Sequence, residues 1–452
     1  MNGLRRAAIA AVVALAGCSG GSSGGANAPF SAPVVPRTSP NQPSSKIAHV
    51  VIIFQENRTV DDLFNGFPGA DTVRSGRNSE NKTIPLQPIG LSAPYDLGHT
   101  HAGFELEYNG GKMNGFDKIG SACEGATVCI AQGLRAYGYV PHDEIKPYFI
   151  MAMRYTFADR MFQTNQGPSI PAHQYIVSGT STVTNGAALR AADNPLTPAL
   201  EKSGGCDSPA GSLVSLIDKA GNLSQKVYPC FDRISLMDLV DRQSLSWRYY
   251  QANLGPGIWN GPDAILHIRK SAEFASDVVA PPSRVLTDIA KGRLANVVWI
   301  TPTGSSSDHA RVNNGSGPSW VASVVNAIGE SRYWNDTAIL VTWDDWGGWY
   351  DHVPPPLYNS YELSFRVPLI VISAYAKNHY VSHVQYEFGS LLKFTEETFG
   401  LPSLHTTDVR ANDLADCFDF SKPPSKFKRI PTKYPAGYFL RLPISRKNPD
   451  DY

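Results

Sequence analysis

The sequence has no excess of charge of either sign, because 40 lysines and arginines balance 40 aspartates and glutamates over 452 residues. A protein that binds nucleic acid without regard to its sequence needs a basic surplus, so the balance argues against that class. Long apolar runs are also missing beyond the N-terminus, which excludes a polytopic membrane protein. Hydrophobic residues still make up 42% of the chain, enough to bury the core of one large domain or two smaller ones.

Cysteine is scarce, and the first of the 6 cysteines lies in a targeting segment. Cys18 follows two arginines and a short apolar run that ends in Leu-Ala-Gly, a pattern typical of a secretory signal with a bacterial lipobox. We therefore expect residues 1–18 to direct export and Cys18 to be lipidated; an ordinary signal peptide is the alternative. Residues 19–45 are rich in Gly, Ser and Pro, which predicts a flexible tether. Residues 46–452 would then form a single domain at the cell envelope, on the outer membrane or facing the periplasm, or be secreted.

The other cysteines bear on the export prediction. In an exported protein, Cys123 with Cys129 and Cys206 with Cys230 are plausible local disulfides, and Cys417 is left over. The alternative is that some of them are buried free thiols. Their spacing does not indicate a cysteine-based zinc site.

Short apolar runs rich in Val and Ile indicate the fold class. They lack alternation, as expected for strands buried on both faces of a parallel sheet. The runs cover residues 47–54, 295–300, 338–343 and 367–373, and segments with helical spacing cover 320–331 and 388–399. Strands that alternate with helices predict an α/β fold with a mostly parallel central sheet. Residues 187–282 carry few strand patterns, so we expect a helical and irregular excursion over the sheet there.

Polar residues follow three of the apolar runs. Glu56 and Asn57 come after the first, His309 follows the second, and Asp344 and Asp345 come directly after the third. Ligands of open α/β sheets bind beyond the carboxyl ends of the strands. Adjacent carboxylates repel each other and a divalent cation relieves that repulsion, so this combination predicts a metal site. The competing interpretation of the acidic pair is a surface turn, where Asp and Gly are common.

Two other segments offer groups for catalysis. His99 and His101 lie two residues apart, and either could donate to a phosphate oxygen or a leaving group. Ser169 follows a Gly-Pro turn and precedes a stretch with helical character, so its hydroxyl is a candidate nucleophile beside helix N-terminal amides. The competing interpretation of Ser169 is a helix N-cap, the more frequent role of Ser in that position.

Aromatic residues crowd the segment that contains the acidic pair: Trp343, Trp346, Trp349 and Tyr350. They could form an apolar wall for a lipid or aryl group beside a phosphate. Packing beneath the loop is the alternative, and it suits Trp343 at least as well.

Taken together, these motifs resemble the bacterial phospholipase C and acid phosphatase family of phosphoesterases, part of the alkaline-phosphatase-like superfamily. The matching segments occur in the family's order and cover residues 49–58, 99–116, 167–169, 307–309, 342–355 and 365–373. Two positions depart from the family pattern: Asn114 stands where Asp is frequent, and Ser364 stands where Gly is frequent.

The resemblance implies a three-layer α/β/α sandwich and a metal-dependent hydrolase of phosphoric esters that acts through a phosphoserine. The substrate would be a phosphate ester or a phospholipid, and the cofactor a divalent metal ion. Asn57, His99 and His309 would also contact the substrate. The residues that match the family's functional positions are Ser169 as nucleophile, Glu56, Asn57, Asp344 and Asp345 at the metal and phosphate, and the histidines His99, His309 and His352.

Two other functions compete with this one. A sulfatase-like enzyme or a phosphonate hydrolase would handle similar tetrahedral anions, but such enzymes usually need a modified Cys or another nucleophile, and the context of Ser169 does not match that. An exported metal-binding lipoprotein of the same fold without turnover is the non-enzymatic alternative.

Overall fold

The computed structural model of the protein describes residues 46–123, 129–196 and 203–444. The predicted signal, lipobox and tether lie outside these ranges. Among the described helices, none combines the length and the apolar character needed to cross a membrane.

A central sheet of eight strands, in the order β13-β12-β14-β1-β15-β16-β8-β17, organises the fold. Adjacent strands run parallel except where β16 pairs antiparallel with β15 and with β8. The predicted mostly parallel sheet is therefore confirmed, while the fourth apolar run, expected as a parallel strand, runs in the opposite direction. The strands are β1 (His49–Gln55), β8 (Thr156–Ala158), β12 (Trp247–Tyr250), β13 (Val278–Val279), β14 (Val297–Ile300), β15 (Thr337–Trp343), β16 (Leu369–Ser373) and β17 (Tyr380–Ser382).

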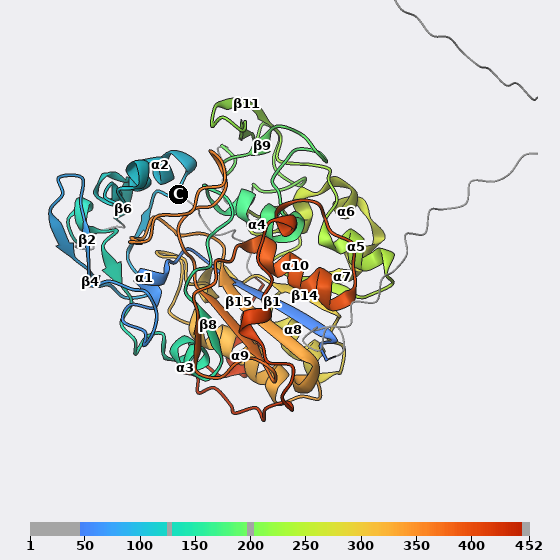
Figure 1. The fold of residues 1–452 in the computed structure, drawn as a ribbon. Helices are drawn as coiled ribbons and strands as arrows, with labels where there is room; N and C mark the ends of the chain where they lie inside the picture. Colours follow the sequence, from blue (N-terminus) through green and yellow to red (C-terminus); the bar gives the residue numbers. More distant parts are fainter. Residues whose placement is uncertain (1–45, 124–128, 197–202, 445–452) are drawn as a thin grey trace, which may run out of the picture. The chain divides into compact units, whose positions relative to one another are not determined.

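Helices cover both faces of this sheet, as the α/β prediction requires (Figure 1). One group consists of α3 (Lys146–Arg154), α8 (Arg284–Ala290) and α9 (Gly317–Gly329). The other consists of α4 (Ser169–Ser178), α5 (Leu236–Arg242) and α10 (Phe388–Phe399). The core between the layers is built from the fully buried strand residues, because both faces of β1, β14 and β15 pack against helices.

Residues 187–282 are expected from the sequence to form an excursion over the sheet, but part of this stretch belongs to the central sheet. β12 and β13 fall within residues 187–282 and add to the edge of the central sheet. β13 has only two residues, and β12 (Trp-Arg-Tyr-Tyr) contains an arginine and lacks Val and Ile, so neither gives a recognisable apolar run. The rest of the stretch matches the expectation of short helices and irregular chain, with a small antiparallel sheet. Its elements are β9 (Arg190–Ala191), β10 (Val214–Ile217), β11 (Leu223–Val227), α6 (Leu266–Lys270) and α7 (Ala272–Asp277).

A second apolar cluster lies beside the central sheet and contains most of the aromatic residues of the segment after β15. Trp346, Trp349 and Tyr350 are buried there with Phe104 and Phe116. They therefore pack as core residues, and the alternative of an exposed apolar wall does not hold for them. The surrounding elements are α1 (Val60–Leu63), β2 (Ser75–Arg77), β3 (Thr83–Pro85), β4 (Gln87–Pro88), β5 (Tyr95–Leu97), α2 (His101–Tyr108), β6 (Ser121–Cys123) and β7 (Gly138–Tyr139), while α11 (Ala436–Phe439) lies near the C-terminus.

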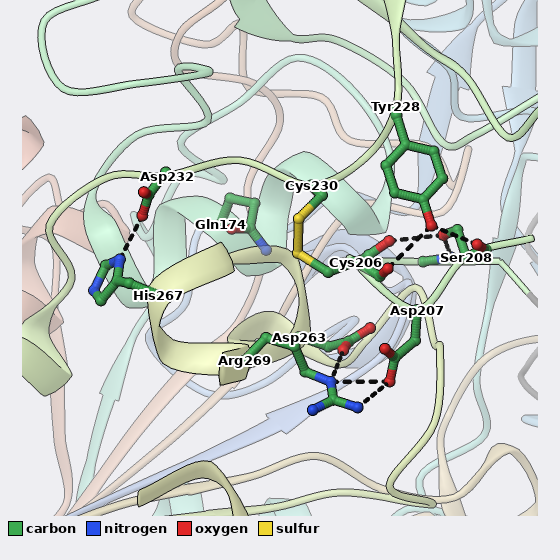
Figure 2. Close-up of a disulfide and its surroundings, with 12 residues drawn as sticks. Gln174, Cys206, Asp207, Ser208, Tyr228, Cys230, Asp232, Asp263, His267 and Arg269 are labelled. Atoms are coloured by element: carbon green, nitrogen blue, oxygen red, sulfur yellow. Dashed lines mark hydrogen bonds and ion pairs between the residues drawn. A yellow bond between two sulfur atoms is a disulfide. The ribbon is translucent and has the colours of Figure 1, made fainter. Parts of the chain in front are cut away.

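Both expected disulfides are present. Cys123 is bonded to Cys129 and Cys206 to Cys230, and Cys417 is a buried free thiol. Figure 2 shows the second disulfide with the ion pairs around it. Covalent cross-links of this kind suit an exported protein, because the cytoplasm keeps thiols reduced.

Candidate active site

The carboxyl edge of the sheet brings together residues that are far apart in the sequence. Gln55, the last residue of β1, pairs in register with Trp343, the last residue of β15. Glu56 and Asp344 follow these two residues directly, so they emerge side by side. Both side chains are fully buried. The structure therefore brings the acidic groups together at this edge of the sheet, as the sequence predicts.

Ser169 lies at the same edge and does not cap its helix. It is the first residue of α4, Pro168 occupies the N-cap position, and no side chain there makes a capping hydrogen bond. Instead, the Ser169 Oγ donates to Asp345 Oδ2 at 3.3 Å, and both residues are fully buried. The structure thus joins the hydroxyl to the acidic pair and does not support the N-cap interpretation.

A group suited to a metal ion forms next to this pair. Glu56, His173 and Asp344 each offer one ligand atom, and these atoms lie within 4.8 Å of one another. His173 Nε2 is 3.6 Å from Glu56 Oε1 and 3.6 Å from Asp344 Oδ2. Two carboxylates and an imidazole are a donor set that divalent metals such as zinc accept, so the residues fit the predicted cofactor.

His173 was not among the residues identified from the sequence. It follows Ser169 by four residues on α4, and side chains with that spacing lie on the same face of a helix. That spacing is the signal that could have indicated it. The segment otherwise has the apolar composition of a core helix, and all of its residues are buried.

Asn57 and His99 connect the acidic groups. The Asn57 backbone N–H donates to Asp344 Oδ1 at 3.3 Å, and its side-chain Nδ2 lies 3.2 Å from His99 Nε2. His99 Nδ1 lies 2.7 Å from the Leu97 carbonyl, which can only accept, so Nδ1 carries a hydrogen. In the neutral ring of this tautomer, Nε2 carries no hydrogen. It faces Asn57 Nδ2 and, at 3.9 Å, Asp345 Oδ2.

The turn after the acidic pair explains how these side chains are fixed. Asn57 has φ 60°, a left-handed conformation that Asn tolerates better than most residues. A Cβ at Gly347 would lie 2.6 Å from Asn57 Cβ, so only glycine lets the two segments approach this closely. The Gly347 N–H donates to Asp345 Oδ1 at 2.8 Å, and the Asp345 N–H donates to Asp344 Oδ1 at 2.8 Å. These bonds hold both carboxylates in place.

His309 approaches the site from the segment after β14. Its ring centroid is 6.3 Å from that of His99. Nδ1 lies 2.7 Å from the carbonyl oxygen of Ala310, so that nitrogen is a donor, and Nε2 is 3.8 Å from Asp96 Oδ2. His309 is fully buried. The structure therefore brings His309 next to His99, a proximity that the sequence patterns do not predict.

Asp308, the neighbour of His309, is a buried carboxyl that supports this segment. Its Oδ2 accepts from the Tyr148 hydroxyl at 2.8 Å and from Trp343 Nε1 at 3.0 Å. Burial raises the pKa of Asp308 to about 7, although these two hydrogen bonds and the charge of Arg58 act in the opposite direction. The group is thus largely protonated in the folded protein at mildly acidic pH.

This raised pKa predicts that stability falls as pH rises. Between pH 3.8, the ordinary value, and about 7, Asp308 is protonated in the folded chain and ionised in the unfolded chain. Folding then takes up a proton, so the free energy of unfolding decreases with pH, on the order of 1.4 kcal/mol for each pH unit. Asp308→Asn is expected to reduce this slope in urea unfolding curves measured from pH 4 to pH 7. The exposed Asp143→Asn is the control, and an unchanged slope in Asp308→Asn would contradict the assignment.

His352, the remaining predicted histidine, belongs to a different group. Among the described residues its polar contacts are with Asp61 Oδ2 (2.6 Å from Nδ1), Asp71 Oδ1 (3.1 Å from Nε2) and Arg366. Burial lowers the pKa of His352, but the hydrogen bond and charge of Asp61 outweigh this and the net shift is upward. Arg366 also pairs with Asp351 at 3.0 Å. The structure therefore places the partly buried His352 in a separate charge network, whose members are not those that surround Ser169.

The chain is similar to several known proteins. The Phosphoesterase family model matches residues 47–402. Phospholipase C A of Mycobacterium tuberculosis is 24% identical, over 92% of this chain and 86% of that protein. Non-hemolytic phospholipase C of Pseudomonas aeruginosa is 23% identical, over 89% of this chain and 62% of that protein. A solved protein of the alkaline phosphatase superfamily from Vibrio parahaemolyticus aligns with a TM-score of 0.35 and 10% identity, over 79% of this chain and 67% of that one.

The family match covers well over half of the chain and includes every residue of the site described above. The chain therefore belongs to the Phosphoesterase family and is a hydrolase acting on phosphoric esters, as its sequence motifs predicted.

Proposed function

We propose that this hydrolase works through a phosphoserine at Ser169 and needs a divalent metal ion. One observation carries the proposal: the Ser169 hydroxyl donates to Asp345, whose neighbour Asp344 belongs to the metal-type group with Glu56 and His173. A nucleophile beside a metal-type donor set is the arrangement that phosphoryl transfer requires. A bound divalent ion would stabilise the serine alkoxide and the phosphoryl oxygens.

The residues of the chain have distinct tasks in this scheme. Asp345 would accept the hydrogen bond of the Ser169 hydroxyl and take up its proton as the oxygen attacks phosphorus. A bond then forms between Ser169 Oγ and phosphorus while the bond to the leaving oxygen breaks in line with it. Asn57 Nδ2, and His99 with a proton on Nε2, would donate to the equatorial oxygens, on which negative charge spreads during transfer.

His309 is the proposed proton donor to the leaving alcohol. Its Nδ1 donates to the Ala310 carbonyl, so His309 would act as the imidazolium and give the second proton, on Nε2, to the leaving oxygen. Water then attacks phosphorus and gives a proton to His309 Nε2, while the Ser169 oxygen leaves phosphorus and regains its hydrogen from Asp345. The product is phosphate if the substrate was a monoester and a phosphomonoester if it was a diester.

The substrate class is tested with two chromogenic esters. The names of the phospholipase C relatives support a phospholipid or another phosphodiester, whereas a phosphatase would prefer a monoester. We expect the purified protein, supplied with divalent metal, to release nitrophenolate from p-nitrophenyl phosphate, from p-nitrophenylphosphorylcholine, or from both at different rates. The ratio assigns the preference.

A third ester, p-nitrophenyl sulfate, is the control for the sulfatase-like alternative. Hydrolysis of the sulfate alone would contradict the proposal. If protein that binds metal hydrolyses none of the three esters, a binding protein without turnover would be favoured.

We also propose that the protein is exported and anchored by a lipid on Cys18. The lipobox pattern and the two disulfides support this location. Cys18 lies outside the described residues, and labelling with a radioactive fatty acid, which Cys18→Ser should abolish, is the test.

A further inference from the structure

Trp259 is an aromatic residue that packs against the site from the segment following β12. It forms a small apolar cluster with Ile170 and Ile258, and each of the three side chains is only 2% exposed. Ile170 is the residue directly after Ser169. The Trp259 ring centroid is also 6.1 Å from that of His309, with the planes tilted by 41°. Trp259 thus contacts both the neighbour of the nucleophile and the proposed proton donor.

The indole N–H of Trp259 has no hydrogen-bond partner among the residues that the structure describes, although it is buried. A buried donor without a partner destabilises the folded chain. The Trp343 indole, by contrast, donates to Asp308. Trp299 and Trp320 also have unpartnered indole nitrogens, but both pack within the central core, away from this small cluster. Only Trp259, of these unpartnered indoles, contacts groups of the candidate site.

The position of Trp259 is fixed by the site itself. Its carbonyl accepts from the Tyr249 hydroxyl at 3.0 Å. The same hydroxyl lies 3.5 Å from Nδ1 of His173, whose Nε2 faces the metal-type group. One tyrosine on β12 therefore links the backbone of Trp259 to a candidate metal ligand.

A disulfide-bonded loop supports the same segment from the other side. A Cβ at Gly204, which has φ +125°, would lie 2.3 Å from the carbonyl carbon of Gly257, so the two backbones are in direct contact. The Cys206 N–H donates to the Asp263 carbonyl at 2.8 Å, and Cys206 is bonded to Cys230 (Figure 2). The segment that carries Trp259 is therefore held at both ends, which is what a preformed contact surface for a ligand needs.

We infer that Trp259 contacts the substrate and selects phosphoric esters with a flat aromatic or apolar leaving group. The inference rests on the proposed function, because it assigns Trp259 to the leaving-group side of the site, next to His309. The indole face would pack on the leaving group, since aromatic surfaces favour aromatic and apolar partners. The indole N–H would donate to an oxygen of the bound ester, which would satisfy a donor that is otherwise buried without a partner.

The test compares an aryl ester with a polar one of similar phosphate chemistry. kcat/KM is measured for p-nitrophenyl phosphate and for glycerol 2-phosphate with the wild type, Trp259→Leu and Trp259→Phe. We expect Trp259→Leu to lower the aryl-to-glycerol ratio of kcat/KM by about tenfold, mainly through KM for the aryl ester, as loss of one ring contact implies. Trp259→Phe keeps a ring and should keep the ratio within about twofold, while losing rate on both esters through the missing N–H.

Trp320→Phe is the matched control, because this indole is also buried without a partner but lies in the central core. It is expected to leave the ratio unchanged. Near-ultraviolet circular dichroism and thermal unfolding establish that each variant is folded. If Trp259→Leu lowers both kcat/KM values equally, Trp259 is a packing residue and the inference is wrong. If the wild type hydrolyses only diesters, the same ratio is measured with p-nitrophenylphosphorylcholine as the aryl ester and glycerophosphocholine as the polar one. If the wild type hydrolyses none of these esters, the proposed function fails, and the inference fails with it.

Discussion

Ser169→Ala is expected to lower kcat by at least about 10³-fold with little loss of stability, because it removes the oxygen proposed to carry the phosphoryl group. The Ser169 Oγ makes its hydrogen bond to Asp345 and none that caps α4, since Pro168 occupies the N-cap position. The substitution therefore removes one hydroxyl from the site and leaves the helix start intact. The measurement is steady-state hydrolysis of the preferred nitrophenyl ester, together with thermal unfolding.

Ser178→Ala is the matched control for this prediction. Ser178 is a fully buried serine at the other end of the same helix and takes no part in the proposed chemistry. It should keep the wild-type kcat within about twofold, because its hydroxyl is remote from the transition state. Full turnover by Ser169→Ala would show that another group attacks phosphorus.

Removing a carboxylate from the metal-type group should abolish both metal binding and activity. We expect Asp344→Asn to bind no metal and to have a kcat/KM at least about 10²-fold below that of the wild type. Loss of a residue that only orients a metal ligand already lowers metal affinity or activity by about 10–100-fold. Asp344 also accepts from the backbone of Asn57 and of Asp345, so its charge organises the site as well. His173→Ala should show the same pattern, because its Nε2 faces both carboxylates of the group.

The readout is metal content by elemental analysis, measured alongside hydrolysis of the same ester. In the wild type, a chelator should remove both metal and activity, and one divalent ion added back should restore both. Asp143→Asn, which changes an exposed carboxylate, should behave like the wild type. Asp344→Asn with an unchanged metal content would remove Asp344 from the ligand set.

The sequence predicts strands correctly where burial on both faces of the sheet determines their composition. β1, β14 and β15 are buried on both faces, so their apolar runs were visible, and parallel neighbours bring their carboxyl ends to one edge. The approach of Glu56 to Asp344 follows from that rule. The direction of β16 does not, because a strand buried on both faces has the same composition whether it runs parallel or antiparallel.

Three site-related positions depend on features that a sequence pattern does not carry. His173 faces the metal-type group because of the rotation of α4 against the sheet. His352 follows the acidic pair closely in sequence. After the turn at Gly347, however, its side chain contacts Asp61 and Arg366. Trp259 comes from a segment rich in Gly, Pro and Asn, and its place beside His309 is set by contacts across the fold.

The phosphoserine itself can be observed. Protein incubated with its preferred ester is quenched in acid, digested and analysed by mass spectrometry. A fraction of the peptide that contains Ser169 is predicted to gain the mass of one HPO₃ group if the preferred ester is p-nitrophenyl phosphate, or of one phosphocholine group if it is p-nitrophenylphosphorylcholine. Ser169→Ala should gain neither. Turnover of the ester with no phosphorylated Ser169, or with the phosphate on another residue, would contradict the account.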